Sequence, residues 1–438
     1  MSGAEGRGGG VARAAATVVV EIDGLAPGGD AVGRQRDPAG QETSANGRAT
    51  FVPLAAPGER VRVRIEREKG RVAWGEVDAI ERPGPARVQP PCPVFGTCGG
   101  CQWQHVELEA QRAAKQAIVE RALGTAIGGV RAAGPAFGYR DRAKWAVGQG
   151  GALGFRARRS HQVVDHRVGD AFVCLLPGPE LARAYGALRA LARGLAPEIE
   201  VEAQAGREGV HVNVVRADPT SAAHVRREVD RLRAAGITGL SIAGKPVWGD
   251  DAVDVAEPGS PPLRVPAGGF AQVGRAANAA LVAAVLDALG DTAIRQPGSA
   301  DTAIVELYAG SGNFTRHLAA RWPGQVHASD GDPAAVARGR ANAPAATWSA
   351  RPPSAPADTV LLDPPREGAD RAYLEVASRA RRVVYVSCDP QTLGRDARLL
   401  AASGFRLIRA VALDLMPQTF HVEVVALFER LDPDEVLP

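Results

Sequence analysis

The pattern of apolar and polar residues divides the chain into three parts. Before residue 83, short stretches such as TVVVEID and ERVRVRIER alternate between apolar and polar positions and are separated by turns that contain glycine and proline. This period of two residues is typical of half-buried strands. About five such strands predict a small closed β-barrel of the OB type, a fold that often binds single-stranded nucleic acid.

The middle of the chain is less regular. A helix is predicted over 104–124, ending at Gly124, and two more over 179–194 and 219–235. Strand-like apolar stretches lie beside them, near 144–148, 161–168, 210–215 and 237–243. This mixture predicts a central part of mixed α/β structure.

From about residue 271 the pattern changes again. A helix is predicted over about 272–290, and the apolar strands AIVELYA, QVHASD, DTVLLD, RRVVYVSC and VEVVALFE then alternate mostly with helical stretches. Such an order is typical of a parallel, doubly wound sheet. The predicted fold class is therefore α/β, with a barrel at 14–83, a central mixed α/β domain at 84–265 and a doubly wound domain at 266–438.

Composition narrows the class of protein. The chain has 438 residues, of which 45% are apolar, enough for two or three domains with sizeable cores. No apolar run approaches the roughly 18 residues that a membrane-spanning helix needs. The five cysteines are clustered, which favours a reduced, cytoplasmic protein with a metal site or reactive thiols over a disulfide framework.

Charge is distributed unevenly, although the net charge is only +3. Residues 139–167 hold seven Lys or Arg against two Asp, and residues 59–71 hold six against three Glu. Such stretches indicate a localised surface for a polyanion such as RNA. The alternative is an ordinary solvated surface, and charge alone does not separate the two.

Two motifs in the last third predict a nucleotide-like cofactor. In ELYAGSGNFT a strand runs into a turn, where Gly310 and Gly312 allow the backbone to approach a ligand at the carboxyl edge of a sheet. Asp330 ends the next strand, and its carboxylate can accept hydrogen bonds from a ribose diol. NAD and S-adenosylmethionine (SAM) fit this pattern equally, and a plain turn with a surface aspartate is the alternative.

Three further polar residues begin or end apolar strands. Asp363 in VLLDPPREG precedes a stiff Pro-Pro turn, of a type that lines the base pocket of nucleic-acid methyltransferases. Cys388 lies between a strand and a helix, whose dipole favours a thiolate, and a buried, inert thiol is the alternative. Glu423 begins a strand and is a candidate base if it is partly desolvated, or otherwise an edge-strand surface residue.

Taken together, the motifs resemble the bacterial 23S rRNA (uracil-5-)-methyltransferases, within the RNA 5-methyluridine methyltransferase family. The resemblance covers nearly the whole chain, and the set of segments is specific although its single members are not. The segments are, in order, GLAPGGDAVG with RATFVPLAAPGERVRVRI, ARVQPPCPVFGTCGGCQWQHV, GGFAQVG, ELYAGSGNF, LLDPPREGAD, YVSCDPQTLGRD and HVEVV.

The resemblance implies a TRAM-like barrel at the N-terminus and a [4Fe-4S] cluster in the central domain. Three of the implied ligands lie within ten residues and the fourth is distant: Cys92, Cys98, Cys101 and Cys174. All-thiolate ligation suits an iron–sulfur cluster, and a structural zinc ion stays open as the rival. Cys388 is then free to act as a nucleophile.

The implied reaction is SAM-dependent methylation of carbon 5 of a uridine. Carbon 5 of uracil is a weak nucleophile, so the Cys388 thiolate first adds to carbon 6 and generates an enolate that takes the methyl group. Glu423 then removes the carbon-5 proton, and Cys388 leaves. The target base must leave its stack to reach the pocket. The implied cofactor contacts are Gln272, Tyr308, Asn313, Asp330 and Asp363, the last of which is also a candidate uracil contact.

The resemblance favours a monomer that acts on 23S rRNA, with the T-loop of tRNA as the alternative RNA. Gly274 stands where many members have Asn, and Asp389 follows the nucleophile where Asn is usual. The charge of Asp389 is expected to raise the pKa of Cys388. Three rival functions stay open: a methyltransferase of exocyclic amines that does not use Cys388, a non-catalytic RNA-binding protein, and an NAD-dependent iron–sulfur oxidoreductase.

Overall fold

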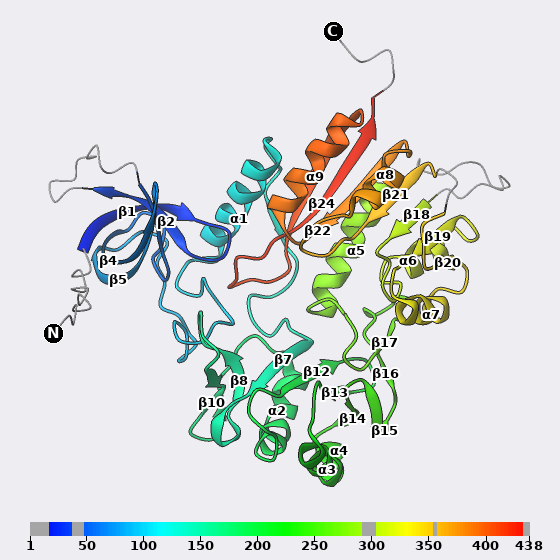
Figure 1. Ribbon diagram of the computed structural model, residues 1–438, viewed down its shortest axis with the longest axis horizontal. Coiled ribbons are helices and arrows are strands. Elements are labelled where there is room, and N and C mark those ends of the chain that lie inside the picture. The colour runs from blue at the N-terminus through cyan, green and yellow to red at the C-terminus, as the bar shows by residue number, and fades with distance from the viewer. Residues whose placement is uncertain (1–16, 37–47, 291–303, 354–356, 432–438) are drawn as a thin grey trace, which may run out of the picture. The chain divides into compact units, whose positions relative to one another are not determined.

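The computed structural model describes most of the chain (Figure 1): residues 17–36, 48–290, 304–353 and 357–431. Residue 14, the predicted start of the barrel, lies outside these ranges. The chain divides into two compact units, residues 1–89 with 105–107 and residues 90–104 with 108–438. The central and C-terminal parts thus share one unit, and the predicted three-domain division stays a prediction.

The first unit contains a closed barrel in which the strand order is β1-β2-β3-β5-β4. Its strands are β1 (Thr17–Leu25), β2 (Ala31–Arg36), β3 (Ala49–Val52), β4 (Arg60–Lys69) and β5 (Val72–Arg82). In β4, Val61 and Val63 are completely buried, while Arg62 between them is exposed. The alternation in the sequence is therefore the inside–outside alternation of the barrel wall, and the predicted barrel is confirmed.

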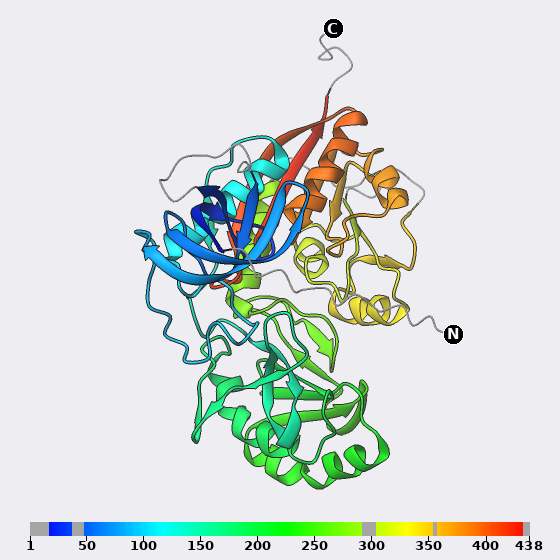
Figure 2. The same cartoon turned by 60° about the vertical axis from the view of Figure 1, so that its left-hand side comes forward.

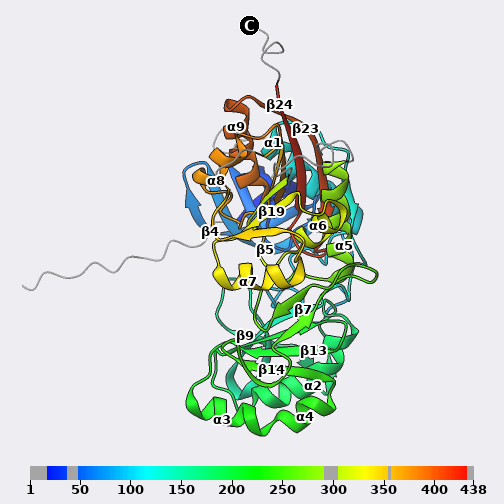
Figure 3. The same cartoon turned by 90° about the vertical axis from the view of Figure 1, so that its right-hand side faces the viewer.

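A central sheet of seven strands lies in the second unit, in the order β15-β14-β13-β12-β7-β8-β9. The strands of this part are β7 (Arg142–Val147), β8 (Leu153–Arg156), β9 (Val163–Asp165), β10 (Arg167–Val168), β11 (Ala171–Phe172), β12 (Glu200–Ala205), β13 (Val210–Val214), β14 (Ile237–Ile242), β15 (Lys245–Gly249), β16 (Ala252–Asp254) and β17 (Arg264–Pro266). Its helical segments are η1 (Gln149–Gly151), α2 (Pro179–Ala192), α3 (Pro219–Arg227) and α4 (Val229–Ala234). Helices α2 to α4 lie on the side of this sheet away from the C-terminal sheet (Figure 3), and Leu181 and Leu188 share a core with Val212.

Helix α1 (Leu108–Leu123) begins later than the predicted position 104. The residues before it are engaged elsewhere, because Val88 N donates to His105 O at 2.9 Å and Glu107 N donates to Ala86 O at 2.8 Å. The helix ends as predicted at Gly124, which has a positive φ of 69°. Glycine adopts this left-handed conformation readily, so it stops the helix.

The C-terminal sheet has eight strands in the order β20-β19-β18-β21-β22-β24-β23-β6. They are β6 (Val130–Ala132), β18 (Ile304–Leu307), β19 (Val326–Ser329), β20 (Thr347–Ser349), β21 (Thr359–Leu362), β22 (Arg382–Ser387), β23 (Phe405–Asp414) and β24 (Glu423–Arg430). Strands β18, β19, β21 and β22 are parallel as predicted, and β20, which was not predicted, continues this parallel part. The expectation that VEVVALFE, now β24, belongs to the parallel sheet is wrong, because β24 pairs antiparallel with both β22 and β23. The sequence did not predict β23, nor that β6, from before the central part, joins this sheet.

Helices cover both faces of the C-terminal sheet (Figures 1 and 2). One face packs against α5 (Arg275–Leu289) and α6 (Thr315–Arg321), and the other against α1, α8 (Arg371–Ala377) and α9 (Pro390–Ala402). Helix α7 (Pro333–Asn342) packs near β20. This is the predicted doubly wound arrangement. Within the described ranges no helix combines the length and the apolar character needed to cross a membrane.

Candidate functional site

Four predicted site residues lie at one edge of the C-terminal sheet. Tyr308 follows β18, Asp330 follows β19, Asp363 follows β21 and Cys388 follows β22. Strand β18 lies between β19 and β21, so the order of the strands reverses there. Open α/β sheets bind ligands in the crevice beyond the carboxyl ends of their strands at such a reversal.

Cys388 and Glu423 lie near each other at the ends of two neighbouring strands. Ser387, the last residue of β22, pairs with Val424 of antiparallel β24, and Cys388 follows Ser387 while Glu423 precedes Val424. Glu423 is only 6% exposed, which confirms the expected desolvation. Burial, followed by the charge of Asp363, raises the pKa of Glu423 well above its ordinary value.

The thiol of Cys388 is not the low-pKa thiolate that the helix dipole led us to expect. Burial and then the charge of Glu423 raise its pKa to about 12, with a further contribution from Asp363. These effects outweigh the adjacent N-terminus of α9. Asp389, which was expected to raise the pKa of the thiol, caps α9: its Oδ1 accepts hydrogen bonds from Gln391 N at 2.8 Å and Thr392 N at 3.3 Å.

The loops beyond β18 and β19 form the candidate cofactor site. Gly310 N donates to Asp330 Oδ2, and Asp332 N donates to Asp330 Oδ1, both at 2.8 Å. Tyr308 has a positive φ of 61°, and its hydroxyl oxygen accepts a hydrogen bond from Asp370 N at 2.8 Å. A non-glycine residue in this strained conformation is a frequent feature of functional loops.

The side chain of Asn313 is paired with another side chain, that of Asn278. Asn313 Nδ2 donates to Asn278 Oδ1, and Asn278 Nδ2 donates to Asn313 Oδ1, each at 2.8 Å. This reciprocal pair joins the loop after β18 to helix α5. A side-chain contact of Asn313 with the cofactor would compete with this pair, so its predicted role stays a prediction.

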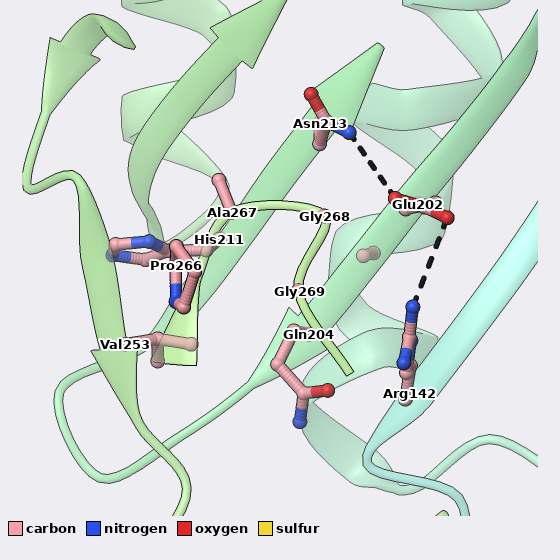
Figure 4. Close-up of a pocket in the computed structure, with 11 residues that line it drawn as sticks. Arg142, Glu202, Gln204, His211, Asn213, Val253, Pro266, Ala267, Gly268 and Gly269 are labelled. Carbon is pink, nitrogen blue, oxygen red and sulfur yellow. Dashed lines mark hydrogen bonds and ion pairs between the residues drawn. The ribbon is translucent and has the colours of Figure 1, made fainter. Parts of the chain in front are cut away.

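Gln272 lies in the segment that leads from β17 to α5. The first part of this segment covers a small pocket of the central sheet (Figure 4), lined by Arg142, Glu202, Gln204, His211 and Asn213. A Cβ on Gly268 would lie 2.5 Å from Asn213 Nδ2, so only glycine fits there. Phe270, between Gly268 and Gln272, is 74% exposed. Contacts with the central sheet therefore hold the chain segment that leads to Gln272.

The backbone around Gly274 leaves no room for a side chain. A Cβ at this position would lie 2.0 Å from the backbone oxygen of Tyr139. Arg275, the first residue of α5, donates through its backbone N to Asp141 Oδ2 at 2.7 Å. Asp141 thereby takes over the capping of α5 that a polar side chain at 274 would otherwise provide.

The four cysteines outside the sheet edge line one pocket, together with His166 and Phe155: Cys92, Cys98, Cys101 and Cys174. Burial raises the pKa of Cys101 to about 11 and that of Cys174 to about 12, and Arg140 opposes both shifts. Four thiols beside a cation fit an anionic thiolate–metal group in their chemistry. Among the described residues, however, no group of three or more His, Cys, Asp or Glu is already arranged to hold a metal ion.

Acidic residues accompany both basic stretches. In the barrel, Arg62 Nε lies 2.8 Å from Asp78 Oδ2. On the central sheet, Lys144 Nζ lies 2.8 Å from Glu200 Oε2, and Arg156 lies 3.7 Å from the other oxygen of Glu200. These surfaces carry both signs of charge, so RNA binding by the two stretches stays a prediction.

Comparisons with known proteins decide the family. Residues 354–431 match the family described as tRNA (Uracil-5-)-methyltransferase, and residues 15–77 match the TRAM domain. The chain is 36% identical over 432 residues to the 23S rRNA (uracil(1939)-C(5))-methyltransferase RlmD of Thiobacillus denitrificans, covering 88% of this chain and 95% of the relative. The chain belongs to the RNA (uracil-5-)-methyltransferase family. The RlmD protein of Pseudomonas putida is 34% identical over 421 residues, covering 88% and 89%.

A solved structure supports the fold. Pyrococcus abyssi tRNA (uracil-54, C5)-methyltransferase, in complex with S-adenosyl-L-homocysteine, matches with a TM-score of 0.70 and 23% identity, covering 93% of this chain and 99% of that one. The resemblance to RNA (uracil-5-)-methyltransferases, the TRAM barrel and the methyltransferase fold are therefore confirmed. The roles of the single site residues and the group held by the cysteines stay predictions.

Two charged residues of this methyltransferase site were missed from the sequence. Glu306 in β18 is 1% exposed, and burial raises its pKa to about 8. A glutamate inside the apolar run AIVELYA was the available signal. Arg366, in the turn after Asp363, lowers the pKa of both Cys388 and Glu423 against the effect of burial. Nothing in the sequence shows which strand ends this arginine approaches.

Proposed function

We propose that this chain transfers the methyl group of SAM to carbon 5 of one uridine in 23S rRNA. The observation that carries the proposal is the pairing of Ser387 at the end of β22 with Val424 of β24, next to which Cys388 and Glu423 lie. Family membership supports SAM and RNA as the two substrates. The rRNA enzymes among the relatives favour 23S rRNA over the T-loop of tRNA.

Cys388, directly after β22, and Glu423, at the start of β24, are proposed to act in different steps of the reaction. When bound, SAM supplies the methyl group, and Gln272, Tyr308 and Asp330 are the residues proposed to hold it. The Cys388 thiolate adds to carbon 6 of uracil, so that carbon 5 becomes nucleophilic and takes the methyl group. Glu423 then removes the proton from carbon 5, and the bond between carbon 6 and the sulfur breaks. The products are RNA that carries 5-methyluridine and S-adenosyl-L-homocysteine; Cys388 is released as the thiolate, and Glu423 holds the proton from carbon 5.

Asp363 is proposed to act as the base that removes the proton from the Cys388 thiol. With its pKa raised to about 12, the Cys388 thiol is protonated at neutral pH and needs a base before it adds to uracil. Burial raises the pKa of Asp363 to about 7, so this carboxyl can accept and return a proton near neutral pH. Arg366 favours the anionic forms of Cys388 and Glu423, as both steps require.

The four-cysteine pocket is proposed to hold a [4Fe-4S] cluster through Cys92, Cys98, Cys101 and Cys174. A single zinc ion at about 2.3 Å from each sulfur would bring the sulfurs within about 4 Å of one another. The four thiols line one pocket, and all-thiolate ligation suits an iron–sulfur cluster. We propose a structural role for this group, since the reaction has no redox step.

The test uses protein purified without oxygen, SAM, and unmodified 23S rRNA or unmodified tRNA in separate reactions. Nucleoside mass spectrometry detects 5-methyluridine, with Cys388→Ala as the control. Product in 23S rRNA that is absent with the variant is expected. Absence of 5-methyluridine from both reactions, with protein that binds SAM, would favour the exocyclic-amine alternative. 5-Methyluridine that persists with Cys388→Ala would rule out Cys388 as the nucleophile, and product in tRNA alone would change the substrate. The enzyme is further proposed to be a cytoplasmic monomer.

A further inference from the structure

We infer that Gln418 is a positioning residue for Glu423, and that through Gln418 the cysteine-rich segment governs removal of the carbon-5 proton. The inference rests on the proposed function. It concerns the connection between β23 and β24, residues 415–422, which we call the Gln418 loop. None of the sequence motifs assigned a role to Gln418, Gln111 or Trp103.

The first observation is a buried pair of amide side chains. Gln418 N donates to Gln111 Oε1 at 2.9 Å, and Gln111 Nε2 donates to Gln418 Oε1 at 3.0 Å. Gln111 is completely buried and Gln418 is 4% exposed. Removing the Gln111 side chain takes away the partners of Gln418 N and Gln418 Oε1, and removing the Gln418 side chain takes away one acceptor of Gln111 Nε2. Loss of these buried hydrogen bonds destabilises the arrangement. Helix α1 thus holds the loop at its centre.

The second observation connects the same residue to the cysteines. The backbone oxygen of Gln418 accepts hydrogen bonds from Gln102 N and Trp103 N, both at 3.0 Å. These two residues directly follow Cys101, one of the proposed metal ligands. Gln111 Nε2 also donates to Trp103 O at 3.0 Å. Helix α1, the cysteine-rich segment and the Gln418 loop therefore meet in one hydrogen-bond network.

The third observation is the backbone conformation of the loop. Gln418 has a φ of 70°, in the left-handed region that non-glycine residues rarely adopt. Such a conformation persists only where surrounding contacts determine it. Two neighbours are also fixed, because Tyr139 Oη donates to Pro417 O at 3.0 Å and Lys115 Nζ donates to Met416 O at 3.2 Å.

These contacts determine where β24 begins. Glu423, the first residue of β24, follows Gln418 after a short stretch of chain and pairs with Leu413 across the loop. Cys388 and the cofactor loops belong to other strands, so a shift of the Gln418 loop displaces the Glu423 carboxyl relative to carbon 5 without moving the nucleophile. A misplacement of about 1 Å can slow a step by about 100-fold. Proton removal is therefore the step that depends on Gln418.

The test separates this step from the one before it. Under single-turnover conditions with uridine-containing RNA, a denaturing gel follows formation and breakdown of the covalent complex between Cys388 and RNA. Gln418→Gly still allows the left-handed backbone conformation and removes the side-chain amide of residue 418. Gln111→Ala removes the side-chain amide to which Gln418 is hydrogen-bonded. Each variant should form the complex at the unaltered rate, break it down at least about tenfold more slowly, and bind SAM normally.

Gln35→Ala is the matched control, because it removes another buried glutamine, which bonds to Thr50 inside the barrel. Its covalent complex should form and break down as in the unaltered protein. Equal slowing of both steps in Gln418→Gly and Gln111→Ala, or no change in either, would overturn the inference. If the unaltered protein gives neither 5-methyluridine nor a covalent complex, the proposed function itself fails.

A second measurement does not depend on activity. Hydrogen exchange by mass spectrometry should show faster exchange of residues 415–422 in Gln111→Ala than in the unaltered protein. Replacing Cys101 by Ser, which weakens the cysteine-held group, should also speed exchange in this loop. Unchanged exchange in both variants would mean that neither α1 nor the cysteine-rich segment fixes the loop, and the inference would be wrong.

Discussion

Lys115 and Asp414 form an ion pair inside the protein, where Lys115 is completely buried and Asp414 is 1% exposed. They lie 299 residues apart in the sequence, on α1 and at the end of β23. Removing this cation leaves the buried carboxylate with the more distant Arg112, whose Nε lies 4.0 Å from Asp414 Oδ2. Lys115→Met should therefore lower the free energy of unfolding by about 3–5 kcal/mol, measured by urea denaturation.

The matched control for this pair replaces both charges. Lys115→Met combined with Asp414→Leu leaves no unpaired charge, so its free energy of unfolding should recover most of the loss. A double variant as unstable as the single one would show that the shape of the site, and not the unpaired carboxylate, causes the loss.

The raised pKa of Glu306 predicts that its contribution to the free energy of unfolding decreases as pH rises. Burial raises its pKa from 4.5 to about 8 in the folded chain. The stability that comes from the protonated form is complete below pH 4.5 and is lost as pH rises toward 8. Glu306→Gln keeps a neutral acceptor for Thr315, so it should raise the free energy of unfolding at pH 8 by about 2–4 kcal/mol and change it little at pH 4.

Denaturation curves at the two pH values check this expectation. Glu375→Gln on α8, whose side chain is 61% exposed, is the control and should change stability little at either pH. An equal effect of Glu306→Gln at both pH values would mean that packing, and not ionisation, decides the stability of this site.

The contrast between Cys388 and Asn313 shows what the sequence could predict. Cys388 was predicted from its place at a strand end, because the edge of a parallel sheet follows from local pattern alone. Its pKa could not be predicted, since that value depends on burial and on Glu423 and Asp363. The antiparallel strand β24 brings Glu423 near, and the parallel strand β21 brings Asp363 near. Asn313 matched a motif, but its pairing with Asn278 depends on how α5 packs.

Contacts between residues far apart in the sequence also limit how much of the fold can be predicted from the sequence. The alternating and helical patterns predicted the barrel and most strands of both sheets. The addition of β6 to the edge of the C-terminal sheet depends on a pairing of Val130 with Ala412. A strand this short has no periodic signal of its own, so only the neighbouring strand defines it.

Arg366 should control the pH profile of the reaction. It is the cation that lowers the pKa of Cys388 and Glu423 against burial. Arg366→Met should shift the acidic limb of the kcat profile to higher pH, because both groups then need a higher pH to ionise, and should lower kcat at neutral pH by about 100-fold. Arg366→Lys should restore part of the rate.

The control for Arg366 is Arg371→Met, since the side chain of Arg371 is 92% exposed on α8. Its kcat profile against pH should match that of the unaltered enzyme. If Arg366→Met raised KM alone and left the acidic limb in place, Arg366 would act in RNA binding and not on the charges of Cys388 and Glu423.

Gly268 connects the central sheet to the proposed cofactor site. Its φ is 78°, and a Cβ would lie 2.5 Å from Asn213 Nδ2. Gly268→Ala should therefore displace the segment that carries Gln272 and weaken SAM binding by about tenfold, a change that isothermal titration calorimetry can measure. Gly259 has the same φ of 78° with no atom within 4 Å of an added Cβ. Gly259→Ala thus isolates the backbone strain, and equal SAM affinity in the two variants would contradict the steric argument.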